Sequence, residues 1–248
     1  GDFVPAIFPI PAAFEKEIIA ASQDKQTTYP PAEGIPALRQ AVSVFLKERE
    51  GLSYDPASEI IISCGGRPLI YAIYRTIVDE GEKVIYAVPS WNNNHYTHFV
   101  AAEHAVLETS PEHNFMPTAS ELQPLLKGAT LLALCSPLNP TGTAFSQKQL
   151  EDICDLVIAE NRSRGEQEKK LFILFHQIYW VLTFGETRHY NPVSLRPELR
   201  DYTIFIDGMS KAFASTGVRV GWSLGPREVI GKMKAILSHI GAWSPMAE

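Results

Sequence analysis

The sequence has few cysteines, no long apolar run and no secretion signal, and each absence narrows the possibilities. Its three cysteines, Cys64, Cys135 and Cys154, are widely spaced, and no Cys-x-x-Cys pair is present. This pattern argues against disulfides and against a metal site, and it favours a reducing cytoplasm. No apolar run approaches the roughly 18 residues of a membrane span. The chain does not open on a basic region followed by an apolar one, so we expect neither a membrane anchor nor a signal peptide.

Positive charge is also scarce. The formal net charge is −6, and no block rich in lysine or arginine interrupts the chain. A nucleic-acid-binding protein carries a basic footprint, which is absent from this sequence. The nucleotide-binding patterns Gly-x-Gly-x-x-Gly and Gly-x-x-x-x-Gly-Lys-[Ser/Thr] are missing too. We therefore expect small molecules as partners.

What is present is a regular alternation of apolar runs and amphipathic segments. With 248 residues, of which 45% are hydrophobic, the chain is long enough to bury a sizeable core. Continuous apolar runs such as 59–63 are typical of buried parallel strands. The predicted strands are 59–63, 83–88, 105–108, 130–135, 171–175 and 202–206. The helices are predicted at about 11–22, 37–50, 68–78, from 118, 146–160 and 227–239. Capping boxes mark the starts of two of them, at Thr118 with Glu121 and at Ser146 with Gln149. This order predicts an α/β fold with a doubly wound, mostly parallel sheet and helices on both faces.

A glycine turn follows the first predicted strand directly. Cys64-Gly65-Gly66-Arg67 separates that strand from a helix. Paired glycines let the backbone approach an anion closely, and the first N–H groups of the helix favour a phosphate there. A tight turn without any ligand is the alternative for a Gly-Gly pair.

Two further strands end in residues suited to a planar ring. Trp91 follows strand 83–88, at the carboxyl end where open α/β sheets bind ligands, and its indole could stack on an aromatic ring. Asn139 follows strand 130–135 in the tetrapeptide Asn-Pro-Thr-Gly, where proline and glycine fix the loop and the amide is a hydrogen-bond donor. A packing role for the tryptophan remains the alternative.

A lysine among small residues follows the strand 202–206. Ser210-Lys211 precedes Gly217, Arg219 and Gly221. An amine buried in such a segment has a lowered pKa, which favours the free base that attacks carbonyl groups. We expect Lys211 to be a buried nucleophile.

Taken in order, these segments resemble the fold type I aminotransferases that depend on pyridoxal phosphate (PLP), the aspartate aminotransferase superfamily. The resemblance implies a sheet of about seven strands. It covers residues 1–248 as the large, PLP-binding domain of such an enzyme. Members of the family continue into a smaller domain whose arginine binds the substrate carboxylate, and this small C-terminal domain has no counterpart in the sequence.

The resemblance also implies a role for each matching residue. Lys211 would form the Schiff base and shuttle a proton, and Tyr29 would reach the cofactor phosphate of the other subunit in a homodimer. Trp91 would stack on the ring, and Asn139 would donate to its oxygen. The implied cofactor-binding residues are Tyr29, Gly65, Gly66, Arg67, Trp91, Asn139, His176, Tyr179, Ser210, Lys211 and Arg219, of which Lys211, Tyr179 and Trp91 are the catalytic candidates.

One position departs from the family pattern. The family has an aspartate where this chain has His176, three residues before Tyr179. That aspartate holds a proton on the pyridine nitrogen, which makes the ring a strong electron sink. Neutral imidazole accepts a hydrogen bond but supplies no negative charge. Asp207 lies at the end of another strand and is not expected to replace the aspartate.

The sequence therefore predicts an aminotransferase that moves an amino group between an amino acid and a 2-oxo acid. A lyase or decarboxylase on the same scaffold is one alternative. The other is a cofactor domain with impaired catalysis, which His176 and the missing small domain both favour. Which amino acid is used does not follow from these residues.

Overall fold

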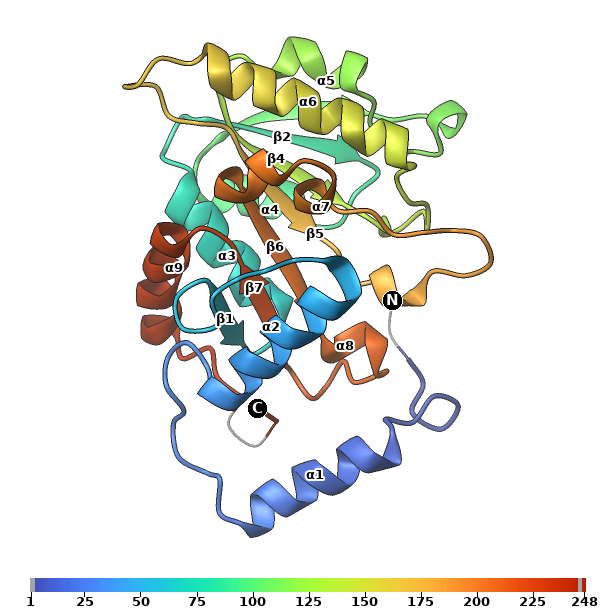
Figure 1. Cartoon of the computed structure of the whole chain (residues 1–248), viewed down its shortest axis with the longest axis vertical. Coiled ribbons are helices and arrows are strands. Elements are labelled where there is room, and N and C mark those ends of the chain that lie inside the picture. The colour runs from blue at the N-terminus through green and yellow to red at the C-terminus, as the bar shows by residue number, and fades with distance from the viewer. Residues whose placement is uncertain (1–2, 245–246) are drawn as a thin grey trace. The chain divides into compact units, whose positions relative to one another are not determined.

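The computed structural model describes residues 3–244 and 247–248, and its central feature is a seven-stranded sheet (Figure 1). The strand order is β1-β7-β6-β5-β4-β2-β3. The pairs β2–β3, β2–β4 and β4–β5 are parallel, whereas β1 and β7 are antiparallel. The prediction of an α/β fold with a mostly parallel sheet of about seven strands is confirmed.

The chain forms two compact units, called unit 1 and unit 2 below. Unit 1 comprises Gly1–Ala72 and Ile206–Glu248, and unit 2 comprises Ile73–Phe205. The chain passes from one to the other within helix α3 (Gly66–Ile77) and again within strand β6 (Thr203–Gly208). The assignment of residues 1–248 to one domain stays a prediction.

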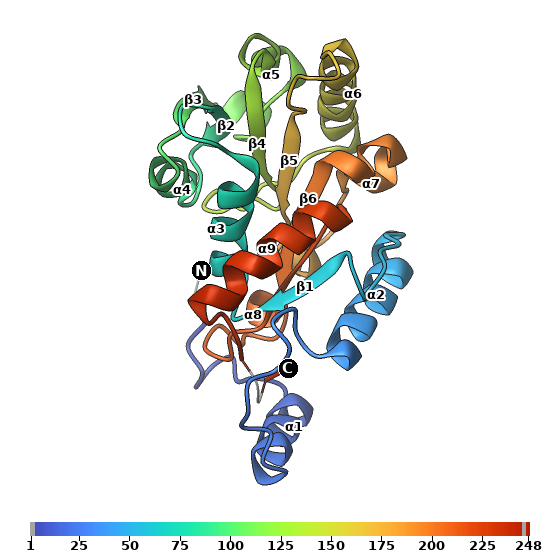
Figure 2. The same ribbon diagram turned by 90° about the vertical axis from the view of Figure 1, so that its left-hand side faces the viewer.

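Unit 1 contains one end of the sheet order, formed by the neighbouring strands β1 and β7. Its further elements are α1 (Ala12–Gln23), α2 (Pro36–Glu50), β1 (Ile60–Ser63), α8 (Met209–Ala212), β7 (Gly221–Leu224) and α9 (Arg227–Ile240). The prediction that 59–63 is a parallel strand is wrong, because Ile60 pairs with Leu224 and Ser63 with Gly221 in antiparallel register. The run is nevertheless buried throughout, since α2 and α9 both pack against β1 (Figure 2). Burial, and not strand direction, therefore explains its apolar residues.

Helix α1 differs from the other long helices of unit 1. It has no buried residue, and Figure 1 shows it standing apart from the rest of that unit. Its Phe14 ring lies 5.8 Å from the ring of Phe213, just after α8. The N-terminal segment thus contacts the end of the lysine-bearing segment.

Unit 2 contains the parallel strands and the helices that pack beside them. Its further elements are β2 (Lys83–Val88), α4 (Asn93–Phe99), β3 (Glu103–Glu108), the 3-10 helix η1 (Pro111–His113), α5 (Ala119–Leu126), β4 (Ala129–Cys135), α6 (Gln147–Ser163), β5 (Phe172–His176), η2 (Trp180–Leu182), α7 (Pro192–Leu195) and η3 (Pro197–Tyr202). Helices α5 and α6 pack together (Figure 1). All residues of β4 except the last are buried, as expected of a strand within a parallel sheet.

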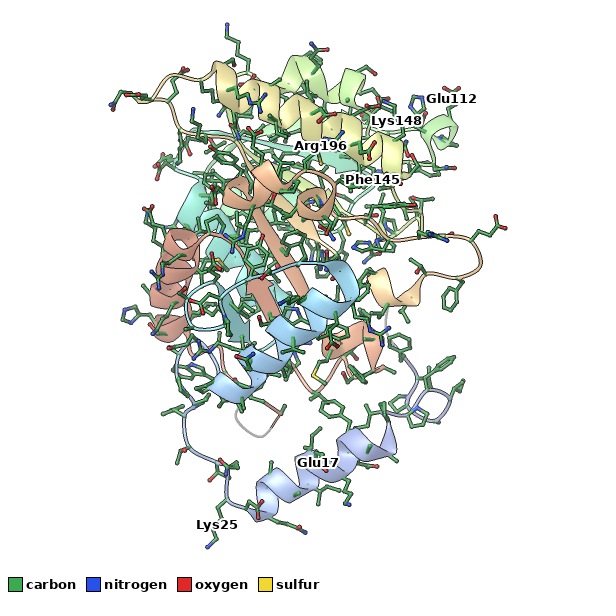
Figure 3. All side chains as sticks on the ribbon, in the orientation of Figure 1. Glu17, Lys25, Glu112, Phe145, Lys148 and Arg196 are labelled. Carbon is green, nitrogen blue, oxygen red and sulfur yellow. The ribbon has the colours of Figure 1, made fainter. Side chains whose placement is uncertain are left out.

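Two helices of unit 2 begin with the capping boxes that the sequence predicts. Thr118 accepts from the backbone N–H of Glu121 at the start of α5, and Ser146 accepts from that of Gln149 at the start of α6. In each case the third residue reaches back to the N–H of the cap. Beside the second cap, Phe145 is buried while Lys148 is exposed (Figure 3). The caps fix where both helices start.

Candidate active site

In unit 1 the turn after β1 depends on glycine. Gly65 has a φ of +93°, and a Cβ there would overlap Nη2 of Arg219. A Cβ on Gly221 would lie 2.8 Å from the carbonyl carbon of Gly65. Both positions therefore need glycine, one for its backbone conformation and both for the close approach of neighbouring groups.

Arg219 lies over this turn. Its Nη2 donates to the carbonyl oxygen of Cys64 (3.1 Å) and its Nη1 to that of Thr216 (2.6 Å). The backbone of Arg219 is left-handed (φ +68°), and its carbonyl oxygen accepts from Oγ of Ser244 (2.7 Å). Backbone strain of this kind persists where the surroundings hold it, often at functional sites. Ser244 is a residue that the sequence did not single out.

Helix α3 completes an anion-binding arrangement in unit 1. It begins at Gly66, two residues earlier than expected, so that Gly66 and Arg67 belong to its first turn. The N–H groups of a first helical turn have no acceptor within the helix, and the N-terminus carries partial positive charge. A guanidinium over a glycine turn at a helix start fits a phosphate well. We refer to Gly65, Gly66 and Arg219 as the phosphate cradle.

Lys211 lies in the same unit, on the short helix α8. The expectation that it is buried is wrong: its side chain is only half-buried, although Ser210 beside it is buried. The Lys211 amine lies 6.0 Å from the centre of the Phe3 ring, within the range of a cation–π contact. Strand β6 ends at Gly208 and α8 begins at Met209, so Lys211 lies close to the carboxyl end of the strand.

Tyr29 is an exposed residue of unit 1. Its side chain is 82% exposed, and its ring lies 5.0 Å from that of Trp243. Packing on the neighbouring prolines therefore does not account for it.

In unit 2 the ends of two neighbouring strands bring Cys135 and His176 together. The two residues are register partners in the β4–β5 pair, and the backbone N–H of Ser136 donates to the carbonyl oxygen of His176 (3.1 Å). Cys135 Sγ lies 4.0 Å from His176 Nδ1 and donates to the Pro137 carbonyl oxygen (3.3 Å). Burial raises the pKa of the Cys135 thiol to about 11. The sequence did not single out Cys135 as a site residue.

Asn139 and Tyr179 also meet in unit 2. Asn139 Nδ2 donates to Tyr179 Oη (3.3 Å). The asparagine loop is held by the N–H of Leu138, which donates to the carbonyl oxygen of Thr143 (2.7 Å). Burial, followed by the nearby Cys135, raises the pKa of Tyr179, so its hydroxyl keeps its proton at neutral pH. These polar side chains suit the oxygen of a hydroxylated ring.

Trp91 lies between β2 and α4 in a loop of the same unit. Its side chain is half-buried, and the next residue, Asn92, has a left-handed backbone (φ +64°). Asn93 then accepts a hydrogen bond from the Tyr74 hydroxyl through Oδ1 (3.3 Å). Across residues 3–244 and 247–248 we find no cluster of histidine, cysteine and carboxylate side chains able to hold a metal ion, and no helix there is long and apolar enough to cross a membrane.

Comparison with known proteins decides the family. The profile of aminotransferase class I and II matches residues 4–247. The chain belongs to this family. Family members use PLP, and both the cradle of unit 1 and the polar pair Asn139–Tyr179 of unit 2 have the chemistry that such a cofactor requires. His176 is the residue that departs from the expected set.

Individual relatives point the same way. An aspartate aminotransferase of Bacillus sp. (strain YM-2) is 30% identical over 236 residues, which are 94% of this chain and 57% of the relative. An aspartate/prephenate aminotransferase of Thermus thermophilus is also 30% identical, over 94% of this chain and 57% of the relative. The solved aspartate aminotransferase of Thermus thermophilus with maleate superimposes with a TM-score of 0.87 at 28% identity, covering 96% of this chain and 59% of the other. The chain therefore spans somewhat more than half the length of these relatives.

Proposed function

We propose that the protein is a PLP-dependent aminotransferase that moves an amino group between an amino acid and a 2-oxo acid. The observation that carries the proposal is the phosphate cradle, in which Arg219 lies over Gly65 at the start of α3, in the same unit as Lys211. A phosphate bound in the cradle would anchor the cofactor. The Lys211 amine, which follows the end of β6, would then be available to react with the cofactor. Aspartate is the first donor to assay, because it gives its name to the relatives above.

Each residue has a physical task in this reaction. When bound, the cofactor withdraws electrons from the substrate and weakens a bond at its Cα. The Lys211 amine accepts the Cα proton as a general base and returns it as an acid. Arg219 would hold the phosphate, assisted by the N–H groups of Gly66 and Arg67 and by the hydroxyl of Ser210. Asn139 and Tyr179 would serve as hydrogen-bond partners of the ring oxygen, and Trp91 would contact the ring.

We further propose that the protein is a homodimer with shared active sites and that it works in a reducing cytoplasm. The exposure of Tyr29 supports the shared site, because a side chain that serves a neighbouring subunit must be exposed in the single chain. A monomer in light scattering that still binds PLP fully would contradict the shared site.

Covalent trapping of the cofactor tests the proposal directly. We expect added PLP to give a visible absorbance band, and borohydride reduction to leave a cofactor mass on the peptide that contains Lys211. The variant Lys211→Ala should lose the label and about 10²–10⁴-fold in turnover, because it removes the group that moves the proton.

The matched control is Lys232→Ala. Lys232 is an exposed lysine that pairs with Glu228 four residues before it in α9 (2.9 Å). Its loss should leave labelling and turnover unchanged. A label on other lysines, with none on Lys211, would overturn the proposal. Formation of glutamate from an amino donor and 2-oxoglutarate separates transamination from a lyase, which releases product without the keto acid.

A further inference from the structure

A short segment after α9 is hydrogen-bonded to two parts of the phosphate cradle. Helix α9 is followed by Gly241, whose left-handed backbone (φ +65°) turns the chain. The carbonyl oxygen of Ala242 then accepts from the backbone N–H of Cys64 (3.1 Å), and Oγ of Ser244 donates to the carbonyl oxygen of Arg219 (2.7 Å). The same segment therefore holds the turn after β1 and the arginine that lies over it.

The hydrogen bonds around Arg219 form a closed ring within unit 1. Its Nη2 donates to the carbonyl oxygen of Cys64 (3.1 Å), and the N–H of Cys64 donates to Ala242. Two residues later, Ser244 donates back to Arg219. The bond from Arg219 to Cys64 joins residues 155 positions apart, and the bond from Ser244 joins residues 25 positions apart. The arginine is thus held by distant segments, and losing one bond of such a ring weakens the others.

The backbone of Arg219 needs a restraint of this kind. Its φ of +68° is left-handed, a conformation that costs free energy in a residue with a Cβ. When a backbone leaves the left-handed region, its carbonyl group changes direction, so the bond from the Ser244 hydroxyl stabilises the observed conformation over the right-handed one. The direction of Cβ changes as well, and this direction decides whether the guanidinium reaches the carbonyl oxygen of Cys64.

We propose that Ser244 is a positioning residue that keeps Arg219 left-handed, and so keeps its guanidinium over Gly65, where it binds the cofactor phosphate. The identity of the ligand rests on the proposed function. A serine hydroxyl has one proton, and that of Ser244 is directed at the Arg219 carbonyl oxygen, so none is left to donate to a phosphate. The effect of Ser244 therefore passes through Arg219 and is confined to ligands that carry a phosphate.

Guanidinium NMR without any cofactor tests the positioning role. We expect ¹⁵N-arginine-labelled wild type to show resolved Nη–H signals of Arg219, because both Nη atoms donate to carbonyl oxygens. The signals are assigned by their loss in Arg219→Lys. In Ser244→Ala they should broaden into those of freely rotating guanidinium groups, whereas Ser244→Thr, which keeps the hydroxyl, should retain them. Unresolved Arg219 signals in the wild type, or unchanged signals in Ser244→Ala, would overturn the proposal.

The matched control is Ser43→Ala. Ser43 is a half-buried serine of α2 whose Oγ donates to the carbonyl oxygen of Tyr54 (2.8 Å), so it makes the same kind of bond elsewhere in unit 1. Both alanine variants should lose similar stability in urea unfolding, because each loses one hydrogen bond. Only Ser244→Ala should change the Arg219 signals. A change in both variants would reflect a general loosening of unit 1 and would count against a specific role for Ser244.

A comparison of two ligands extends the test to binding. Ser244→Ala should weaken PLP binding by about tenfold, the effect of losing one good hydrogen bond to the phosphate. Binding of pyridoxal, which lacks the phosphate, should stay the same. Ser244→Thr should recover most of the PLP affinity, since the hydroxyl is present again. An equal loss for both ligands would contradict the proposal, because Ser244 would then act on the whole site and not on the arginine.

A double-mutant cycle shows whether the effect passes through Arg219. In an Arg219→Ala background no guanidinium remains to be positioned, so Ser244→Ala should cost no further PLP affinity. A further loss in that background would speak against the proposal. Absence of PLP binding to the wild type would refute the proposed function instead, and the guanidinium signals would still decide the role of Ser244.

Discussion

The candidate site residues of unit 1 and those of unit 2 are of different kinds. In unit 1 the phosphate cradle depends on backbone: a left-handed Gly65, the close approach of Gly221 and the start of α3. In unit 2 the candidate residues are side chains that lie at or after strand ends, among them His176, where the resemblance implies an aspartate. Such backbone geometry as that of unit 1 tolerates few substitutions, because a Cβ at Gly65 or Gly221 would overlap neighbouring atoms. A hydrogen bond to a ring nitrogen can be made by more than one residue type. The strand-end positions of unit 2 should therefore vary more readily among relatives than the glycines of unit 1.

The largest effect should come from breaking the cradle. Gly65→Ala adds a Cβ where Nη2 of Arg219 lies, and the flexible guanidinium must move away. We expect PLP affinity, measured by fluorescence titration, to fall about 10- to 100-fold, the range for losing a charge-assisted hydrogen bond. The left-handed conformation should also cost about 1–3 kcal/mol in unfolding free energy.

Gly81→Ala is the control for backbone strain. Gly81 has a similar φ of +78°, but nothing lies within 4 Å of an added Cβ. It should lose comparable stability and no PLP affinity. Equal affinities in the two alanine variants would show that the guanidinium position above Gly65 does not matter for the cofactor.

A smaller effect, an increase in PLP affinity, should follow from placing a carboxylate at position 176 in unit 2. His176→Asp supplies a negative charge, and a hydrogen bond to a charged acceptor exceeds a neutral one by about 1 kcal/mol. We expect PLP to bind about fivefold more tightly, with a shifted visible band. His98→Asp, an exposed change of the same kind on α4, should leave both unchanged. If His176→Asp altered neither affinity nor spectrum, position 176 would not face the pyridine nitrogen.

Much of the fold was predictable because local rules and packing agree. The capping boxes at Thr118 and Ser146 lie where the sequence puts them. The direction of β1 was not predictable, because burial by α2 and α9 gives the same apolar run to a parallel and an antiparallel strand. An apolar pattern reports burial on both faces and says nothing of which strand lies alongside.

At the site, the sequence identified residue types but not their surroundings. Gly65 was predictable because a tight turn directly after a strand favours glycine, and its φ of +93° bears this out. The surroundings of Lys211 were not, since its amine lies 6.0 Å from the ring of Phe3, which is more than 200 residues away in the chain. Cys135 could have been found: like His176 it ends a buried strand, and the ends of neighbouring parallel strands meet at one edge of the sheet.

The smallest expected effect is a difference in the pH dependence of stability between the two helix caps of unit 2, Thr118 on α5 and Ser146 on α6. Burial alone would raise the pKa of Glu121, but hydrogen bonds from Thr118 and the charge of His113 outweigh it, and the pKa lies below its usual value. A carboxyl with a lowered pKa contributes stability above its unfolded pKa and loses that contribution as the pH falls through the folded one. Thr118→Ala should therefore cost about 1 kcal/mol at neutral pH and less below about pH 4.

Ser146→Ala should cost about the same at neutral pH, since it removes an equivalent cap. Its partner, Gln149, does not titrate, so this cost should stay constant on acidification. Urea unfolding of both variants and the wild type at about pH 7 and pH 4 measures the difference. Parallel behaviour of the two caps would mean that Glu121 does not contribute as a carboxylate. If the cost of Thr118→Ala falls at about pH 4 while that of Ser146→Ala does not, the Glu121 carboxylate contributes to the first cap. An unchanged affinity for PLP in both variants would show that the caps stabilise unit 2 without affecting the cofactor.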